Sequence, residues 1–323
     1  MYLYKTCAFL FLFLSFSQMA TCQEKGYEPI KKDSTFTPYV RYDKESGNYI
    51  IGYLKSAETG KIYKTLFIPT SKVTPQFNVL INREGNSYLY DYTLLNTGKG
   101  QQDISSFELR IKGLYKTIDI SSPWQYSDMG EVPFVQFSHK VLEVPDWDPD
   151  KPIKFKSDLQ KGEKVRFKIE SEYLPSIVTS YVAGQPQKLD LSFAIPPSYK
   201  VREMVDSLRR KESYNRGLKV KTIGPQKVSD DITPLALADT LNSYLSFSCD
   251  TTWIANQGIC RSLNVKLGNV ERQLKREKTK TAANSLQSLL NELKALKDKQ
   301  ISSEAYGLLY YNSAFLLQKL QDQ

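Results

Sequence analysis

The sequence predicts two domains of different class: an antiparallel β-sandwich of the immunoglobulin or fibronectin kind, then a small all-α helical bundle. Two patterns support this. In residues 38–199, short runs of alternating apolar and polar residues are separated by turn signals, which is typical of sandwiches. In residues 226–323, apolar residues recur three and four positions apart, as expected for amphipathic helices that pack together.

The first 22 residues have the features of an export signal. Lys5 precedes an apolar run at 9–14 that is too short to span a bilayer. Ala20 and Cys22 are small residues at positions −3 and −1 of a cut before residue 23. We therefore expect a secreted, periplasmic or cell-surface protein with no transmembrane segment in its mature chain.

Cys22 also leaves a second route to the cell surface open. A cysteine at the end of a bacterial lipoprotein signal becomes the acylated first residue, which would anchor the protein to a membrane. Thr21 departs from the small residue that usually precedes such a cysteine. We therefore favour plain secretion over lipid anchoring through Cys22.

A polar, turn-rich stretch at 23–37 is expected to be a flexible lead, and the strands follow it. The expected strand segments are 39–42, 48–53, 62–68, 77–81, 88–94, 107–111, 134–137, 153–155, 165–169 and 177–182. Tyr88, Tyr90 and Tyr92 share one face of their strand. An exposed face would be a platform for sugar rings, but packing against aliphatic residues of the preceding strand is the commoner arrangement.

Aromatic residues in the loops are the candidate binding residues. Trp124, Tyr126 and Trp147 lie in Pro-rich stretches between expected strands, and loops of this kind carry ligand sites in many folds. Indole and phenol rings can stack on the apolar face of a sugar. The sequence therefore predicts contact with a polysaccharide or another cell-surface polymer at these three residues.

Residues 200–225 are expected to be a charged connector between the domains. Eight basic and three acidic residues lie between 200 and 221, so much of the net charge of +9 is local. A nucleic-acid-binding protein would spread basic residues over a folded face with aromatics between them. We therefore expect no nucleic-acid partner, and a solvated connector rather than a contact with anionic polymer or lipid.

The C-terminal helices are expected at 261–276, 280–299 and 302–320, with earlier helices near 201–208 and 234–245. Ser302 is a candidate N-cap for the last one. The stretches 262–267, 282–286 and 301–305, with 253–260 before them, resemble the FIMAH helical domain. The resemblance implies an accessory, noncatalytic module on an exported bacterial protein.

Two groups of residues could bind metal or cross-link the chain. Cys249 and Cys260 are an even pair in an exported chain, which indicates a disulfide, since the only histidine, His139, is distant. Alternating carboxylates at 146, 148 and 150 (Asp146, Asp148 and Asp150) could surround Ca²⁺. The glycine and the final glutamate of an EF-hand loop are absent there, so a surface loop is the favoured interpretation and no cofactor is expected.

The candidate chemistry favours binding over catalysis. His139 has no nucleophile motif beside it. Glu143, Glu170 and Glu172 could act as a carboxylate pair in glycoside hydrolysis, but nothing in the sequence sets their separation. Our first hypothesis is an exported noncatalytic binding or scaffold protein of the bacterial envelope or extracellular space. The alternative is an exported carboxylate-dependent hydrolase with an accessory helical module.

Overall fold

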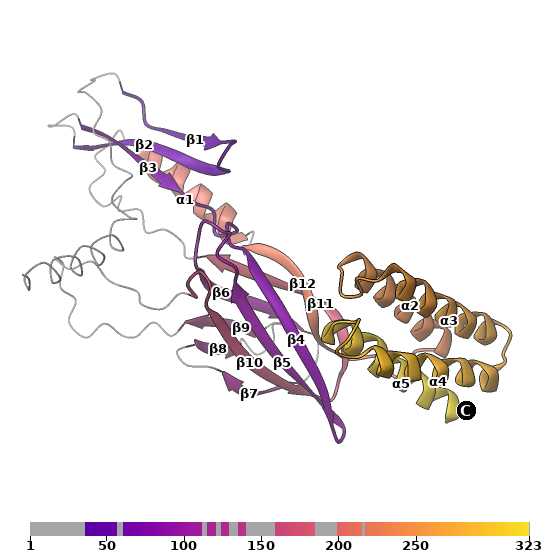
Figure 1. The fold of residues 1–323 in the computed structure, drawn as a ribbon. Coiled ribbons are helices and arrows are strands. Elements are labelled where there is room, and N and C mark those ends of the chain that lie inside the picture. Colours follow the sequence, from indigo (N-terminus) through magenta and orange to yellow (C-terminus); the bar gives the residue numbers. More distant parts are fainter. Residues whose placement is uncertain are drawn as a thin grey trace, which may run out of the picture. The chain divides into compact units, whose positions relative to one another are not determined.

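The structure, a computed structural model, describes residues 36–56, 61–111, 115–120, 124–128, 135–139, 159–184, 199–214 and 217–322. Within these residues the chain forms antiparallel β-sheets and, after them, a four-helix C-terminal region (Figure 1). It divides into two compact units. One comprises residues 1–69 and 186–215, and the other comprises residues 70–185 and 216–323.

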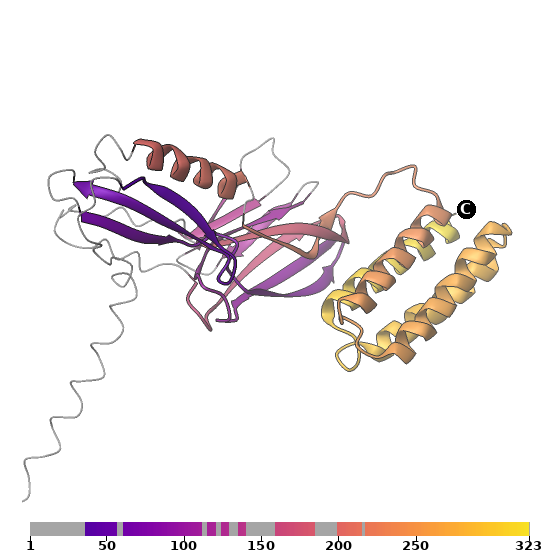
Figure 2. The ribbon, with the colours of Figure 1, turned by 90° about the horizontal axis from the view of Figure 1, so that it is seen from above.

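The first unit is a three-stranded sheet with one helix. Its elements are β1 (Tyr39–Asp43), β2 (Asn48–Ser56), β3 (Lys61–Phe67) and α1 (Tyr199–Tyr214). The strands are antiparallel in the order β1-β2-β3, and Figure 2 shows α1 lying along them. Val205 of α1 packs on Ile51, Tyr53 and Phe67. The expected hairpin and the expected short helix are both present, because their apolar residues form one small core.

The second unit begins with two antiparallel sheets. Their strands are β4 (Pro75–Glu84), β5 (Ser87–Asn96), β6 (Ile104–Arg110), β7 (Lys116–Ile120), β8 (Trp124–Asp128), β9 (Val135–His139), β10 (Lys164–Ser171), β11 (Leu174–Gly184) and β12 (Leu218–Gln226). The four-stranded sheet has the order β4-β5-β10-β7, and the five-stranded sheet has the order β12-β11-β6-β9-β8. Of residues 200–225, expected as a connector, 200–214 therefore lie in α1 of one unit and 218–225 lie in β12 of the other.

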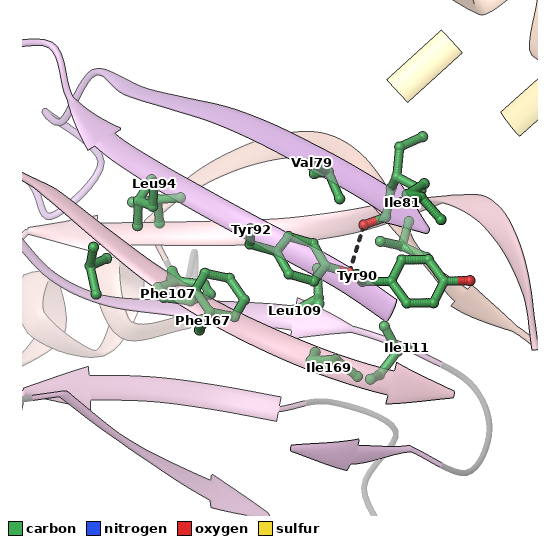
Figure 3. Close-up of a cluster of buried hydrophobic side chains, with 14 of the residues drawn as sticks. Val79, Ile81, Tyr90, Tyr92, Leu94, Phe107, Leu109, Ile111, Phe167 and Ile169 are labelled. Carbon is green, nitrogen blue, oxygen red and sulfur yellow. Dashed lines mark hydrogen bonds between the residues drawn. The ribbon is translucent and has the colours of Figure 1, made fainter. Parts of the chain in front are cut away.

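The two sheets share one hydrophobic core (Figure 3). Tyr92 of β5 stacks on Phe167 with ring centroids 4.6 Å apart, and its hydroxyl donates a 2.9 Å hydrogen bond to the carbonyl of Ile223 in β12. Tyr88 and Tyr90 are buried in the same core. The core interpretation of these tyrosines is thus confirmed, because alternate residues of β5 point between the sheets.

Four helices complete the second unit: α2 (Pro234–Asp250), α3 (Gln257–Lys275), α4 (Thr279–Leu296) and α5 (Ser303–Gln321). None of the described helices is long and apolar enough to cross a membrane. Three have side-chain N-caps, from Thr233, Asn256 and Ser302. Their apolar stripes meet in a second core that lies between the helices, as the three-and-four spacing predicts.

Helix α5 joins the helical core to the sheets. Leu309 and Leu316 belong to the core between the helices, whereas Leu308 and Tyr311 belong to the core of the sheets. Helix α5 contacts β4 and β11. The sequence placed the start of a separate helical domain at residue 226. In the structure this residue lies inside the second compact unit, which contains both the two sheets and the four helices.

Candidate functional site

The structure corrects the placement of Trp124. It is the first residue of β8, only 8% of its surface is exposed, and its ring lies 6.1 Å from that of Phe107 between the sheets. The loop expected at this point is a strand, so Trp124 contributes to the core and is not an exposed binding residue. Tyr126 also lies in β8, where its backbone pairs with Phe137. Trp147 lies outside the described residues.

The acidic candidates do not come together in the described part of the chain. Asp146, Asp148, Asp150 and Glu143 lie outside it. Glu170 lies in β10, between Leu89 and Lys116 of the neighbouring strands, and Glu172 follows at the turn into β11. His139 ends β9, opposite Trp124. Among the described residues no group of three histidine, cysteine or acidic side chains could hold a metal ion.

Instead, the register of the five-stranded sheet brings basic residues together on its outer face. Thr179 of β11 pairs with Lys221 of β12 on one side and with Arg110 of β6 on the other. Residues in register on neighbouring strands point to the same face. Arg110 and Lys221 are exposed, and the Lys221 ammonium donates a 3.1 Å hydrogen bond to the hydroxyl of Thr179. The three side chains therefore form one cross-strand row.

A second row lies directly beside the first. Tyr181 of β11 pairs with Lys219 of β12 and with Glu108 of β6. The two rows are joined at Arg110, whose Nε donates a 2.9 Å hydrogen bond to Glu108 and whose guanidinium lies 5.0 Å from the centre of the Tyr181 ring. Arg110 is thereby held in place over the sheet. We call these six residues the basic row pair.

The basic row pair has the charge pattern of an anion-binding surface. It carries three cations, Arg110, Lys219 and Lys221, and one carboxylate, Glu108. An Arg whose Nε is already bonded still presents its terminal nitrogens, which suit a carboxylate or phosphate in bidentate geometry. The surface therefore suits an extended anionic ligand laid across the strands.

Sequence reasoning missed the basic row pair because it treated Lys219 and Lys221 as part of a connector. The signal was present: Leu218 and Val220 alternate with Lys219 and Lys221. Such alternation predicts a half-buried strand. Which residues then become neighbours depends on strand register, and this short stretch does not reveal the register.

A cavity of about 170 Å³ lies in the second unit between β11, β12, α2 and α5. Its polar side chains largely bind one another: Ser176 donates a 2.6 Å hydrogen bond to Gln226, and the hydroxyls of Ser176 and Tyr244 are 2.8 Å apart. Burial raises the pKa of the Tyr244 hydroxyl. These bonds connect helix α2 to the sheet, and we assign no ligand to the cavity.

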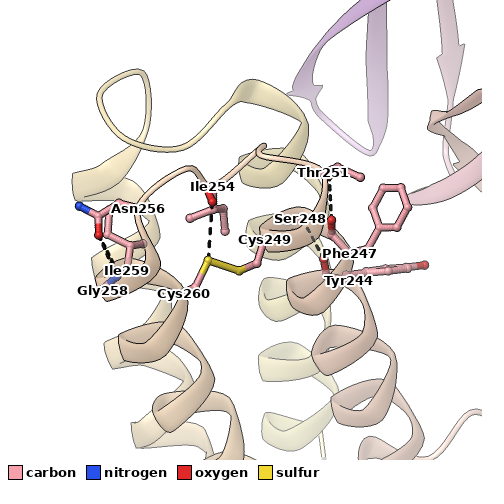
Figure 4. The surroundings of a disulfide bond; sticks show 10 residues. All are labelled: Tyr244, Phe247, Ser248, Cys249, Thr251, Ile254, Asn256, Gly258, Ile259 and Cys260. Carbon is pink, nitrogen blue, oxygen red and sulfur yellow. Dashed lines mark hydrogen bonds between the residues drawn. A yellow bond between two sulfur atoms is a disulfide. The ribbon is translucent and has the colours of Figure 1, made fainter.

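The predicted disulfide is present (Figure 4). Cys249 near the end of α2 and Cys260 in α3 are bonded, with their Cα atoms 6.2 Å apart. In the loop between them, Trp253 packs edge-on against Phe247 at 5.3 Å. The Trp253 carbonyl accepts a 2.9 Å hydrogen bond from the amide of Ser302. The crosslinked loop therefore holds the residue that caps helix α5.

The geometry of these helices can now be compared with known families. No curated protein matches the chain. A family model matches it over residues 238–318, which run from the second turn of α2 almost to the end of α5. The four helices, with their disulfide, thus contain a FIMAH domain.

Proposed function

We propose that this protein is an exported, noncatalytic binding or scaffold protein of the bacterial envelope or extracellular space. In this proposal residues 1–22 direct export, with a lipid anchor at Cys22 as the alternative, and the two sheets are an immunoglobulin- or fibronectin-like sandwich. The ligand is an acidic polysaccharide, bound by the basic row pair. The charge arrangement of that surface is the observation that carries the proposal.

Charge complementarity selects the ligand. Three cations and one carboxylate on adjacent strands give this sheet face a net positive charge. Neighbouring strands are about 4.8 Å apart, so Lys221 and Arg110, two strands apart, are separated by roughly 10 Å. A polymer with repeated carboxylates can contact both ends of a row at once, and a neutral polymer gains nothing from these charges.

The contact between Arg110 and Tyr181 determines what Tyr181 contributes to ligand binding. Because the guanidinium lies over its ring, Tyr181 supports Arg110 by a cation–π contact, and stacking on a sugar would require Arg110 to move. Anion binding by a supported Arg110 needs no such movement. We therefore assign recognition to charge rather than to aromatic stacking, which changes the mechanism expected from the sequence.

Binding of a polyuronate tests this proposal. We expect the chain to be retarded in gels that contain alginate and not in gels that contain dextran. Arg110→Ala/Lys221→Ala should weaken alginate binding by about tenfold or more, as expected for loss of charge-assisted contacts. Binding should weaken as salt increases and stay level from pH 5 to 8, where Lys, Arg and uronate all remain charged.

The four-stranded sheet offers a matched control. Lys164→Ala/Arg166→Ala removes the same charge from the outer face of β10, where Arg166 pairs with Asp91 at 3.0 Å. This variant should bind alginate as the unaltered chain does. Equal losses in both double variants would show that only net charge matters, and would reject the site. Cleavage of the polymer during the assay would instead favour the hydrolase alternative.

A further inference from the structure

Strand β4 is the edge of the four-stranded sheet, and side chains of α5 bind its outer edge. The amide of Val79 donates a 2.7 Å hydrogen bond to the Glu304 carboxylate, and the Val79 carbonyl accepts a 2.8 Å bond from the Ser303 hydroxyl. Two residues further on, the Ile81 carbonyl accepts a 3.2 Å bond from the Tyr311 hydroxyl. Helix α5 thus satisfies three of the backbone groups that a further strand along β4 would bind.

The contact between α5 and β4 is close and buried. Only 5% of the Glu304 surface is exposed. A carboxylate is rarely buried without hydrogen-bond partners, and the Val79 amide is a partner here. Gly307 of α5 faces Ile81, and a Cβ added at Gly307 would lie 2.5 Å from Ile81 Cδ1. Tyr311 packs edge-on against Tyr88 at 5.2 Å. A glycine at this turn therefore allows the helix to approach the strand edge.

The sequence of β4 explains why its edge needs a cover. Residues 76–82 contain no charged side chain, and Leu80 on the outer face is 49% exposed. Uncharged, β-prone segments at a sheet edge are templates for pairing with another chain, and Lys or Pro on an edge is a common defence. This edge has neither between 76 and 82. Identical neutral strands also meet without like-charge repulsion.

We propose that helix α5 of the FIMAH domain takes the place of a neighbouring strand along β4, and that β4 pairs with β4 of a second copy when α5 is displaced. The FIMAH domain then acts as an intramolecular cover for a self-pairing edge. This role is independent of polysaccharide binding, since the basic row pair lies on the other sheet. It also accounts for the bonds that Glu304 and Ser303 make to the backbone of Val79.

Two glycine substitutions in the purified chain test this proposal. Gly307→Leu inserts a side chain between α5 and Ile81, whereas Gly268→Leu in α3 is a matched control, because a Cβ there meets nothing within 4 Å. In Gly307→Leu, hydrogen exchange at the Val79 amide should rise about tenfold or more, as expected for a lost buried hydrogen bond. Sedimentation should show a dimer only for this variant.

A second substitution distinguishes edge pairing from other association. Adding Leu80→Lys to Gly307→Leu places a charge beside the edge and should return the chain to a monomer. A Gly307→Leu chain that stays monomeric, or a dimer that survives Leu80→Lys, would overturn the proposal. Circular dichroism should show that the helices persist in each variant.

Glu304→Ala covers the case in which Gly307→Leu does not fold. This variant removes the acceptor of the Val79 amide and adds no bulk to the contact. The Val79 amide should again exchange faster, and Glu304→Gln, which keeps one amide oxygen as an acceptor, should recover part of the protection. Unchanged exchange in Glu304→Ala would show that α5 does not shield β4.

Discussion

Helices α3 and α5 have the same length, 19 residues, but they are buried differently. Helix α3 buries five residues on one stripe, and α5 buries eleven, including Glu304, Asn312 and Ser313. The first packs only on other helices. The second packs on helices with one side and on the sheets with the other. A helix between two cores needs polar side chains that find partners within the protein. In α5, Glu304 accepts from the Val79 amide and Asn312 donates to the carbonyls of Pro175 and Leu308.

The largest expected effect is loss of a buried leucine from either helix. Leu263→Ala in α3 removes a side chain from the core between the helices, and Leu308→Ala in α5 removes one from the core of the sheets. Each should lower the free energy of unfolding by about 2–5 kcal/mol. The two cores lie in one compact unit. In each variant, urea should therefore unfold the sheets and the helices of this unit together, in a single transition.

The same two variants can also contradict this comparison of α3 with α5. If Leu263→Ala split the urea transition into two steps, the helices would unfold without the sheets. Helix α5 would then contribute little to the stability of β4, despite its burial. Circular dichroism near 222 nm follows the helices, and hydrogen exchange at the amides of β5, measured at the same urea concentrations, follows the sheets.

The disulfide should contribute nearly as much as a buried leucine. Cys249→Ala/Cys260→Ala opens a loop with a sequence separation of 11 residues, which costs about 3 kcal/mol in the loop-entropy model. The effect is measured by urea unfolding with and without reductant. Reductant should destabilise the unaltered chain and leave the double variant unchanged. Free thiols in the unreduced protein would contradict the crosslink.

Alkaline pH should unfold the second unit through its buried tyrosines. Burial raises the pKa of Tyr90 and Tyr92 in β5 well above the ordinary value near 10, and it raises the pKa of Tyr311 in α5 as well. The unfolded chain therefore loses these protons first. The stability they contribute is complete below about pH 10 and is lost as pH rises toward the folded-state pKa values.

Absorbance near 295 nm measures this ionisation directly. The β5 tyrosines should ionise only in the same pH range as the unfolding seen by circular dichroism. Ionisation of all tyrosines near pH 10 in a protein that stays folded would contradict their burial. Tyr92→Phe, which retains the ring and loses the hydroxyl that binds Ile223, should reduce the pH dependence.

The smallest expected effect comes from one hydroxyl of α5. Tyr311→Phe removes the hydrogen bond to the Ile81 carbonyl and should lower the free energy of unfolding by about 1 kcal/mol. Tyr310→Phe is the matched control. Tyr310 is the neighbour of Tyr311 in the sequence, and its ring stacks on Tyr306 within the helix, with ring centroids 4.9 Å apart. If the two substitutions had equal effects on the free energy of unfolding, the hydrogen bond from Tyr311 to the Ile81 carbonyl would add no stability.

Local patterns predicted most elements of the fold. The alternation of β4, β5, β10 and β11 and the spacing of α3 to α5 are properties of neighbouring residues, so the sequence reveals them. Strand β12 was missed because its charged residues were interpreted as a connector, β8 because Trp124 follows a proline and was interpreted as part of a loop, and β7 was not predicted at all. All three are edge strands of their sheets, where fewer neighbours constrain the pattern.

Contacts between residues far apart in the chain could not be predicted from local sequence patterns. Ser302, Ser303 and Glu304 were correctly interpreted as the start of a helix, and Ser302 does cap it. The bonds of Ser303 and Glu304 to Val79 were not foreseen, because a capping sequence looks the same whether its remaining side chains meet water or a strand. The basic row pair was missed for the same reason: it depends on which strands become neighbours.

The Val79–Glu304 bond joins residues 225 positions apart, which has a consequence for the time course of synthesis. Chains are made from the N-terminus, at about 5–20 residues per second. Strand β4 is therefore complete roughly 10 to 50 seconds before the start of α5 exists. During that interval its edge has no cover. A nascent chain of this protein is most prone to mispairing then, and a chaperone that binds uncharged strands would have its greatest effect in that window.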